Sequence, residues 1–206
     1  MRVLVVTLSA VVAALTIGGG AALVGASQTE LPGVVRDPAP SAAGLVFDDH
    51  AAGDDPVEAD LVPGPGGITL VYFGYLSCPD MCPLTMSDLA QARQLVGPEL
   101  ADHTNVAFVT VDPARDEPED LRRYLEHFFD DGFLALRAPD DAALEDAAET
   151  LGVRYELEDH APGERYEVAH SAITYVVDDS GAVVRELPFG TTPEDYAQVI
   201  EAALAD

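Results

Sequence analysis

The chain has 206 residues, and its 10 basic residues face 37 acidic ones, which gives a formal net charge of −27. Every basic residue is an arginine. This balance excludes electrostatically driven binding to nucleic acid or to anionic lipid, because both need a basic protein face. The hydrophobic fraction of 48% is enough for a core, whereas two cysteines are too few for a disulfide framework. The acidic surface favours adaptation to high salt over a specific cationic partner, because salt screens the repulsion between like charges.

The N-terminal segment has the pattern of an export signal. Arg2 precedes an uncharged and mostly apolar run at residues 3–28, and a basic residue before an apolar run is typical of such signals. The small-x-small sequence at residues 24–26 favours cleavage, whereas the length of the run, which exceeds the roughly 20 residues that span a bilayer, favours an uncleaved anchor. We predict a signal peptide or membrane anchor at residues 1–26 and favour the anchor, with the domain on the extracytoplasmic face of the cell membrane.

The rest of the chain divides into a tether and one domain. Residues 27–43 are rich in Pro, Ala, Gly and Ser without a period, which predicts a flexible tether, and residues 44–206 have the length of a single domain. Apolar periodicity and capping residues predict the elements of that domain in chain order: a buried strand at 68–75, a helix at 84–96, a second buried strand at 106–111, helices at 117–129 and 140–151, a hairpin of strands at 173–177 and 182–187, and a closing helix at 194–204. This order indicates an α/β fold, a three-layer sandwich with a mixed central sheet.

Both cysteines lie in one motif, CPDMCP, where a buried strand is followed by a helix. The start of a helix carries free N–H groups and partial positive charge, which favour a thiolate. Cys78 and Cys82, four residues apart, can project from one face of a first helical turn and form a disulfide or bind one metal ion. A purely structural disulfide is a weaker interpretation, because so small a loop restricts the unfolded chain little.

The donor set favours copper over other metals. A structural zinc site needs four protein ligands and an iron–sulfur cluster needs four cysteines, whereas two thiolates and one imidazole suit both Cu(I) and Cu(II). The third ligand would then be one of the five histidines, which are His50, His103, His127, His160 and His170. Four of them have the context of solvated or capping residues. His170 directly precedes the strand at 173–177, and on the pattern alone it is as consistent with a packed loop residue as with a ligand.

Three stretches together resemble the Sco/SenC copper chaperones: VYFGYLSCPDMCPLTMSDL, FVTVDPARDEPEDLRRYL and YEVAHSAITYVVDDSG. They occur in the family's order over about residues 44–204, and the family consists of thioredoxin-like proteins implicated in cytochrome c oxidase assembly. The resemblance implies a thioredoxin-like fold, thiolate ligands at Cys78 and Cys82, and a third copper ligand at His170. It also implies that the DPxRD segment, with Asp112, Arg115 and Asp116, helps to build the site.

The chain departs from the family pattern at two places. Ala169 stands before the ligand histidine, where the family commonly has Asp, and this removes a carboxylate that could orient the imidazole. Residues 44–67 match the family's entry hairpin only loosely. Met81 and Met86 could serve as soft auxiliary ligands, but a loop residue and a helix-packing residue are the better interpretations.

The resemblance implies a metallochaperone rather than an enzyme. Such a protein would take copper from a donor protein, hold it as Cu(I) or Cu(II), and deliver it to the copper-binding subunit of a haem-copper (cytochrome c) oxidase, with the N-terminal segment holding it at the membrane. The alternative is a thiol–disulfide oxidoreductase, in which Cys78 and Cys82 reduce the copper-site cysteines of the oxidase. A peroxidase resembling the peroxiredoxins is a weaker third option, since it would need a cysteine that forms sulfenic acid.

Overall fold

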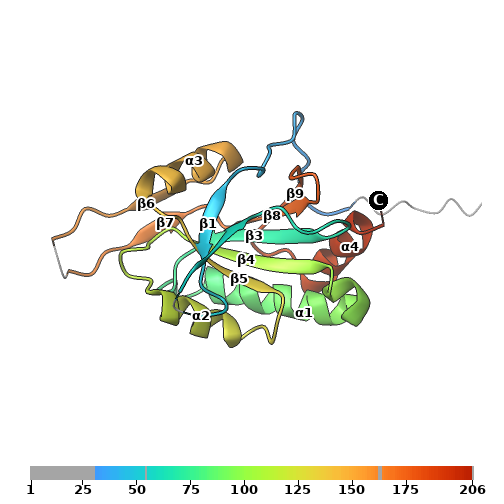
Figure 1. Cartoon of the computed structure of the whole chain (residues 1–206), viewed down its shortest axis with the longest axis horizontal. Coiled ribbons are helices and arrows are strands. Elements are labelled where there is room, and N and C mark those ends of the chain that lie inside the picture. Colours follow the sequence, from blue (N-terminus) through green and yellow to red (C-terminus); the bar gives the residue numbers. More distant parts are fainter. Residues whose placement is uncertain (1–30, 54, 162–163, 206) are drawn as a thin grey trace, which may run out of the picture. The chain divides into compact units, whose positions relative to one another are not determined.

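A seven-stranded mixed sheet forms the centre of the computed structural model, which describes residues 31–53, 55–161 and 164–205. The strand order is β2-β1-β5-β4-β3-β8-β9 (Figure 1). The strands are β1 (Val46–Asp49), β2 (Val57–Asp60), β3 (Ile68–Gly74), β4 (Thr104–Thr110), β5 (Phe133–Arg137), β8 (Ile173–Asp178) and β9 (Val183–Pro188). The three strands β3, β4 and β5 are parallel, and the other pairs in this sheet are antiparallel.

Helices cover both faces of the sheet. They are α1 (Met81–Ala101), α2 (Pro118–Glu126), α3 (Asp141–Leu151) and α4 (Pro193–Ala203). Figure 1 shows α1, α2 and α4 on one side of the sheet and α3 on the other. Every residue of β3 is therefore buried, which explains why its sequence is a continuous apolar and β-branched run. The arrangement confirms the predicted α/β three-layer sandwich with a mixed sheet.

The capping residues that predicted the ends of α3 have that role in the structure. The Asp140 side chain accepts a hydrogen bond from the Ala143 N–H at 2.9 Å, and Gly152 ends α3 in the left-handed conformation with φ of 78°. The exception is α1, which was expected to stop at Gly97. Gly97 instead forms a kink with φ of 81°, and the helical path continues to Ala101 because Pro98 is tolerated in the first turn of the segment after the kink.

Residues 31–43, which the sequence assigns to a flexible tether, run along β9 in the structure. The N–H and C=O of Val34 both form 2.8 Å hydrogen bonds with Glu186, and Ala42 donates to the Gly181 carbonyl at 2.7 Å. The Arg36 guanidinium forms an ion pair with Glu186. These contacts satisfy the otherwise unpaired edge of the sheet, so the compact unit begins at Leu31 rather than at residue 44.

The predicted signal peptide or anchor at residues 1–26 lies outside the residues that the structure describes, as do the first residues of the predicted tether. Among the described residues, no helix is long and apolar enough to cross a membrane.

Candidate metal centre

Cys78 and Cys82 lie where β3 is followed by α1, at the carboxyl end of the parallel strands. Cys82 is in the first turn of α1 and is fully buried, whereas Cys78 precedes the helix and is 7% exposed. Both thiols are free. Gly74, the last residue of β3, leaves room for this turn, since a Cβ there would lie only 3.0 Å from the Cys82 sulfur. The location is the edge at which open α/β sheets commonly place their sites.

The structure brings His170 to the two cysteines. The two sulfur atoms and a ring nitrogen of His170 all lie within 4.8 Å of one another, and Cys82 Sγ is 3.6 Å from His170 Nε2. The Cys82 N–H, in the first turn of α1, donates to Cys78 Sγ at 3.4 Å. Within the part of the chain that the structure describes, no other three His, Cys, Asp or Glu side chains place their donor atoms so close together.

A small second sheet carries His170 to this position. It consists of β6 (Tyr155–Leu157) and β7 (Val168–His170), in which Tyr155 pairs with His170. Beyond β7, the Ser171 N–H donates to the Arg154 carbonyl at 2.8 Å, and the Arg154 N–H donates to Ser171 Oγ at 3.0 Å. These bonds fix the end of β7, so the imidazole extends from an ordered strand rather than from the loop that the sequence indicates.

Two tyrosines of the β3 region complete the walls of the site. Tyr72 and Tyr75 each contact the His170 ring edge-on, with ring centroids 5.9 and 5.5 Å apart and interplanar angles of 88°. The Tyr72 hydroxyl donates to Cys82 Sγ at 3.9 Å. Burial, followed by the charge of Cys82, raises the pKa of Tyr72, so its hydroxyl keeps its proton and remains a donor to sulfur. The apolar run that contains both tyrosines predicts only a strand, so their contact with the site was missed.

Burial dominates the electrostatics of the three donor groups. It raises the pKa of the Cys82 thiol and lowers the pKa of the His170 imidazole. For Cys82 this is the reverse of the effect expected from the helix start. The surroundings thus disfavour an isolated thiolate and an isolated imidazolium, and a cation shared by the donors would compensate the thiolate charge. Two soft sulfur donors and one imidazole nitrogen fit copper.

The DPxRD segment joins the site to the chain that leads into β7. Asp112 is fully buried, forms an ion pair with Arg115, and accepts a hydrogen bond from the Tyr166 hydroxyl at 2.7 Å. Arg115 donates to the Tyr166 carbonyl at 3.0 Å, and its guanidinium carbon lies 3.6 Å from the centroid of the Tyr166 ring. Because Tyr166 precedes β7 by two residues, this clamp of Asp112, Arg115 and Tyr166 ties the strand of His170 to the main sheet.

Asp116 holds the loop before Cys78. Its carboxylate accepts hydrogen bonds from the Leu76 N–H at 3.0 Å and from the Thr110 hydroxyl at 2.6 Å. Burial raises the pKa of Asp116 to about 6, although these two hydrogen bonds act in the opposite direction. A carboxyl with a higher pKa in the folded state binds its proton more tightly there. Its contribution to stability is therefore present at low pH and is lost as the pH rises through about 6.

Replacing Asp116 with asparagine should consequently flatten the pH dependence of stability. The amide is neutral and keeps an oxygen acceptor, so we expect D116N to exceed the wild type in free energy of unfolding near neutral pH by up to about 3 kcal/mol. The difference should shrink as the pH falls below about 6 and disappear only below the ordinary carboxyl pKa of 3.8, where the wild-type carboxyl is protonated in both states. Urea unfolding across this pH range tests the prediction, and parallel pH profiles for the two proteins would contradict it.

The other candidate residues are dispersed. His103, His127 and His160 are exposed, as expected, and the His160 ring stacks on the Tyr166 ring with centroids 3.6 Å apart. His50 is different, because it is only 6% exposed rather than solvated: it follows β1 and its N–H donates to Ala135 on the adjacent β5.

The departures from the family pattern leave the three donor residues Cys78, Cys82 and His170 in place. The methionines that were considered as auxiliary ligands have the following positions. Met86 is fully buried in the core, as its helix-packing interpretation predicts, and Met81 is half-buried. Ala169 is exposed and pairs with Glu156 on β6, so a carboxylate still stands beside the strand that ends at His170.

A mixed-sheet α/β domain with two thiols and an imidazole converging at its sheet edge defines a thioredoxin-like protein with a candidate Cys₂His metal centre. The SCO1/SenC family model matches residues 54–205, so the chain belongs to the SCO1/SenC family.

The individual similarities agree with this membership. The SCO2-like protein RP587 of Rickettsia prowazekii is 31% identical over 66% of this chain and 65% of its own length. The apo Sco1 structure from Thermus thermophilus is 29% identical with a TM-score of 0.67, and covers 87% of this chain and 98% of that one. The copper-bound ScoI of Bradyrhizobium japonicum is 26% identical with a TM-score of 0.64, and covers 84% and 99%. The matches span 58–65% of the length of the four Rickettsia relatives.

Proposed function

We propose that the protein is a copper metallochaperone, which binds one copper ion through Cys78, Cys82 and His170 and delivers it to the copper centre of a haem-copper oxidase. The observation that carries this proposal is the convergence of three donor atoms within 4.8 Å. Copper is the cargo in this proposal. Two thiolates suit Cu(I), and the imidazole nitrogen extends the donor set to Cu(II).

The three-donor arrangement suits release as well as binding. A set of three protein ligands leaves a coordination position for a ligand of the acceptor, so copper need not leave the protein before the acceptor engages it. Access differs among the donors, since Cys82 is fully buried while Cys78 and His170 retain some exposure. We infer that an acceptor approaches from the side of Cys78 and His170.

The proposed partners are a copper donor protein and the copper-binding subunit of a cytochrome c oxidase. Both would be met on the extracytoplasmic face of the cell membrane, and the uncharged run at residues 3–28 supports export to that face. An uncleaved run would also anchor the domain beside a membrane-held oxidase.

A thiol–disulfide oxidoreductase is the second candidate function. The sulfur atoms of Cys78 and Cys82 lie within 4.8 Å of each other, so a local movement of the loop would allow a disulfide. In that reaction the two thiols are oxidised to a disulfide while a disulfide of the acceptor is reduced to two thiols. The more accessible Cys78 would attack the acceptor and Cys82 would close the bond.

Copper stoichiometry and transfer test the chaperone function directly. The reduced protein should bind one equivalent of Cu(I), and C78S and C82S should each lose the bound ion in competition with a chelator. The copper-loaded protein should then transfer it to the reduced copper-binding domain of an oxidase subunit. If the protein binds no copper but reduces the disulfide form of that domain, the oxidoreductase function replaces the chaperone function.

A further inference from the structure

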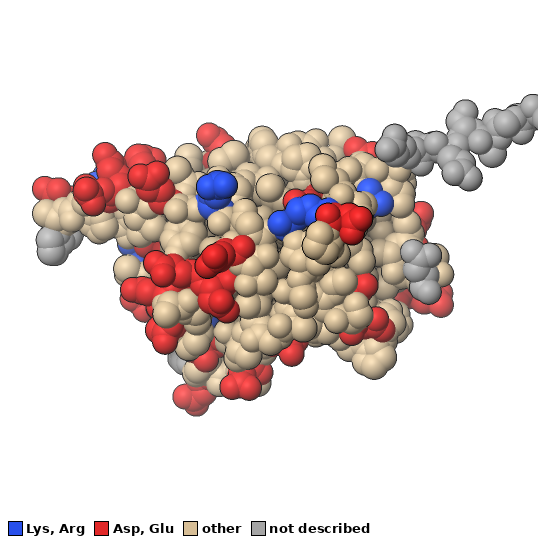
Figure 2. All heavy atoms as spheres, turned by 90° about the horizontal axis from the view of Figure 1, so that it is seen from above, with Lys and Arg blue, Asp and Glu red and all other residues tan. Residues whose placement is uncertain are grey.

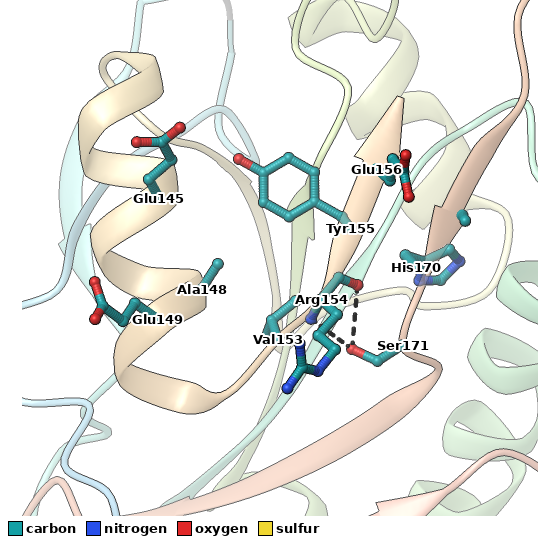
Figure 3. A pocket seen from close by; sticks show the side chains of 10 residues that line it. Glu145, Ala148, Glu149, Val153, Arg154, Tyr155, Glu156, His170 and Ser171 are labelled. Carbon is teal, nitrogen blue, oxygen red and sulfur yellow. Dashed lines mark hydrogen bonds between the residues drawn. The ribbon is translucent and has the colours of Figure 1, made fainter. Parts of the chain in front are cut away.

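A cavity of about 890 Å³ opens beside His170 (Figure 3). One wall is α3, with Glu145, Ala148 and Glu149, and the other is formed by β6 and the end of β7. His170 and Ser171 belong to this second wall. A segment of another protein seated in the cavity would therefore contact a proposed copper ligand directly.

The cavity continues along α3 as a groove. A second cavity of about 580 Å³ shares Glu145 and Tyr155 with the first and extends to Asp140, Asp141 and Pro139. We call these two cavities together the α3 groove. Because the two cavities adjoin at Glu145 and Tyr155 and follow α3, the groove suits an extended stretch of polypeptide rather than a small compact ligand.

Carboxylates dominate the α3 groove. Glu145, Glu149 and Glu156 line the first cavity against one arginine, Arg154. Three aspartates line the second cavity: Asp140, Asp141 and Asp112, the last already paired with Arg115. The arginine of the second cavity, Arg137, already donates to the Pro113 carbonyl at 2.8 Å. Figure 2 shows acidic side chains gathered at the end of the molecule where α3 and the β6–β7 hairpin lie. This charge repels phosphate and carboxylate groups and attracts a cation.

Tyr155 supplies an aromatic surface at the point where the two cavities meet. Figure 3 shows its ring between α3 and the β6–β7 sheet, with Glu145 across the cavity. Burial, followed by the charges of Glu145 and Asp141, raises the pKa of Tyr155, which places the ring in a region of negative potential. An aromatic ring near carboxylates is a favourable environment for a guanidinium or an ammonium group.

We propose that the α3 groove docks an arginine- or lysine-bearing segment of the protein that exchanges copper with this site. This rests on the proposed function for the identity of the partner, and on the groove itself for the chemistry of the segment. Docking there would orient the partner with its copper ligands beside His170, on the accessible side of the donor set. Specificity would come from the pairing of cationic side chains with Glu145, Glu149 and Tyr155.

Peptide binding to the full chain tests the proposal. The probe is a fluorescein-labelled peptide of alternating arginine and glycine, and the matched control is the same peptide with glutamate in place of arginine. The variant E145Q/E149Q removes two groove charges. The variant E99Q/E201Q removes the same charge from exposed positions on α1 and α4. We expect the arginine peptide to bind the wild type, to bind E145Q/E149Q about fivefold more weakly or worse, and to bind E99Q/E201Q within about twofold of wild type.

The outcomes separate the groove from the general charge and from the copper site. An equal loss in both double variants, or a loss in neither, overturns the groove proposal. Copper stoichiometry is measured on the same samples. If the wild type binds the peptide but no copper, the proposed function is refuted, whereas peptide binding in the α3 groove is still supported. A chain that binds copper while E145Q/E149Q transfers it to the oxidase domain at the wild-type rate refutes the docking role.

Discussion

Replacing His170 with alanine is expected to weaken Cu(II) binding by about 100-fold or more, because it removes the only nitrogen donor of the proposed site. Cu(I) should be affected less, since the thiolates of Cys78 and Cys82 can hold it alone. Competition with chelators of known affinity measures both effects, and the absorption of the Cu(II)–thiolate complex should change with the affinity. Equal Cu(II) affinities for H170A and the wild type would refute the three-donor site.

The matched control for H170A is H103A. His103 is an exposed histidine in the turn between α1 and β4, so its removal should leave copper affinity within about twofold of wild type. H170A and C78S together separate the two candidate functions. If thiol–disulfide exchange is the main activity, H170A should retain reduction of the disulfide acceptor while C78S loses it. If copper delivery is the main activity, both H170A and C78S should lose the transfer of copper to the oxidase domain.

Local signals explain why most of the fold was predictable from the sequence. The apolar run of β3 and the caps of α3 at Asp140 and Gly152 are encoded within a few residues. The strand β5 was missed because it has only five residues, and its identity depends on pairing with β4, for example Phe133 with Val106. The edge strand β2 and its neighbour β1 were not predicted from periodicity because acidic residues, which are poor strand formers, occupy half of each.

The site was predictable to the extent that it is local. Cys78 and Cys82 belong to one turn, and their spacing of four residues indicates that they act as a pair. His170 lies 88 positions beyond Cys82, and its contact with the sulfur depends on the short β6–β7 sheet, which has no clear periodicity in the sequence. Only the resemblance to the Sco/SenC family assigned it a role. The tyrosines around the imidazole and the clamp at Tyr166 arise from tertiary packing, which neither a motif nor a period encodes.

Removing the Asp112 carboxylate should produce the largest loss of stability among the site residues. Asp112 is fully buried and is the shared partner of the Arg115 guanidinium and the Tyr166 hydroxyl. In D112A the Tyr166 hydroxyl loses its acceptor, and the Arg115 guanidinium loses its carboxylate partner and keeps its hydrogen bond to the Tyr166 carbonyl. Breaking a buried ion pair costs about 3–5 kcal/mol, and we expect about 3 kcal/mol here, since the Arg115 side chain is 27% exposed and water can solvate it in part.

Urea unfolding of D112A measures this loss, with two variants as references. D120A breaks an exposed ion pair of Asp120 with Arg123 on α2 and should cost no more than about 1 kcal/mol. Y166F removes only the hydroxyl and should cost about 1–1.5 kcal/mol. The clamp also predicts a second effect, because Tyr166 leads directly into β7: Y166F should weaken Cu(II) binding although it touches none of the three donors. A destabilisation of D112A no greater than that of D120A would show that the ion pair does not hold β7, and the position of His170 would then depend on the β6–β7 pairing alone.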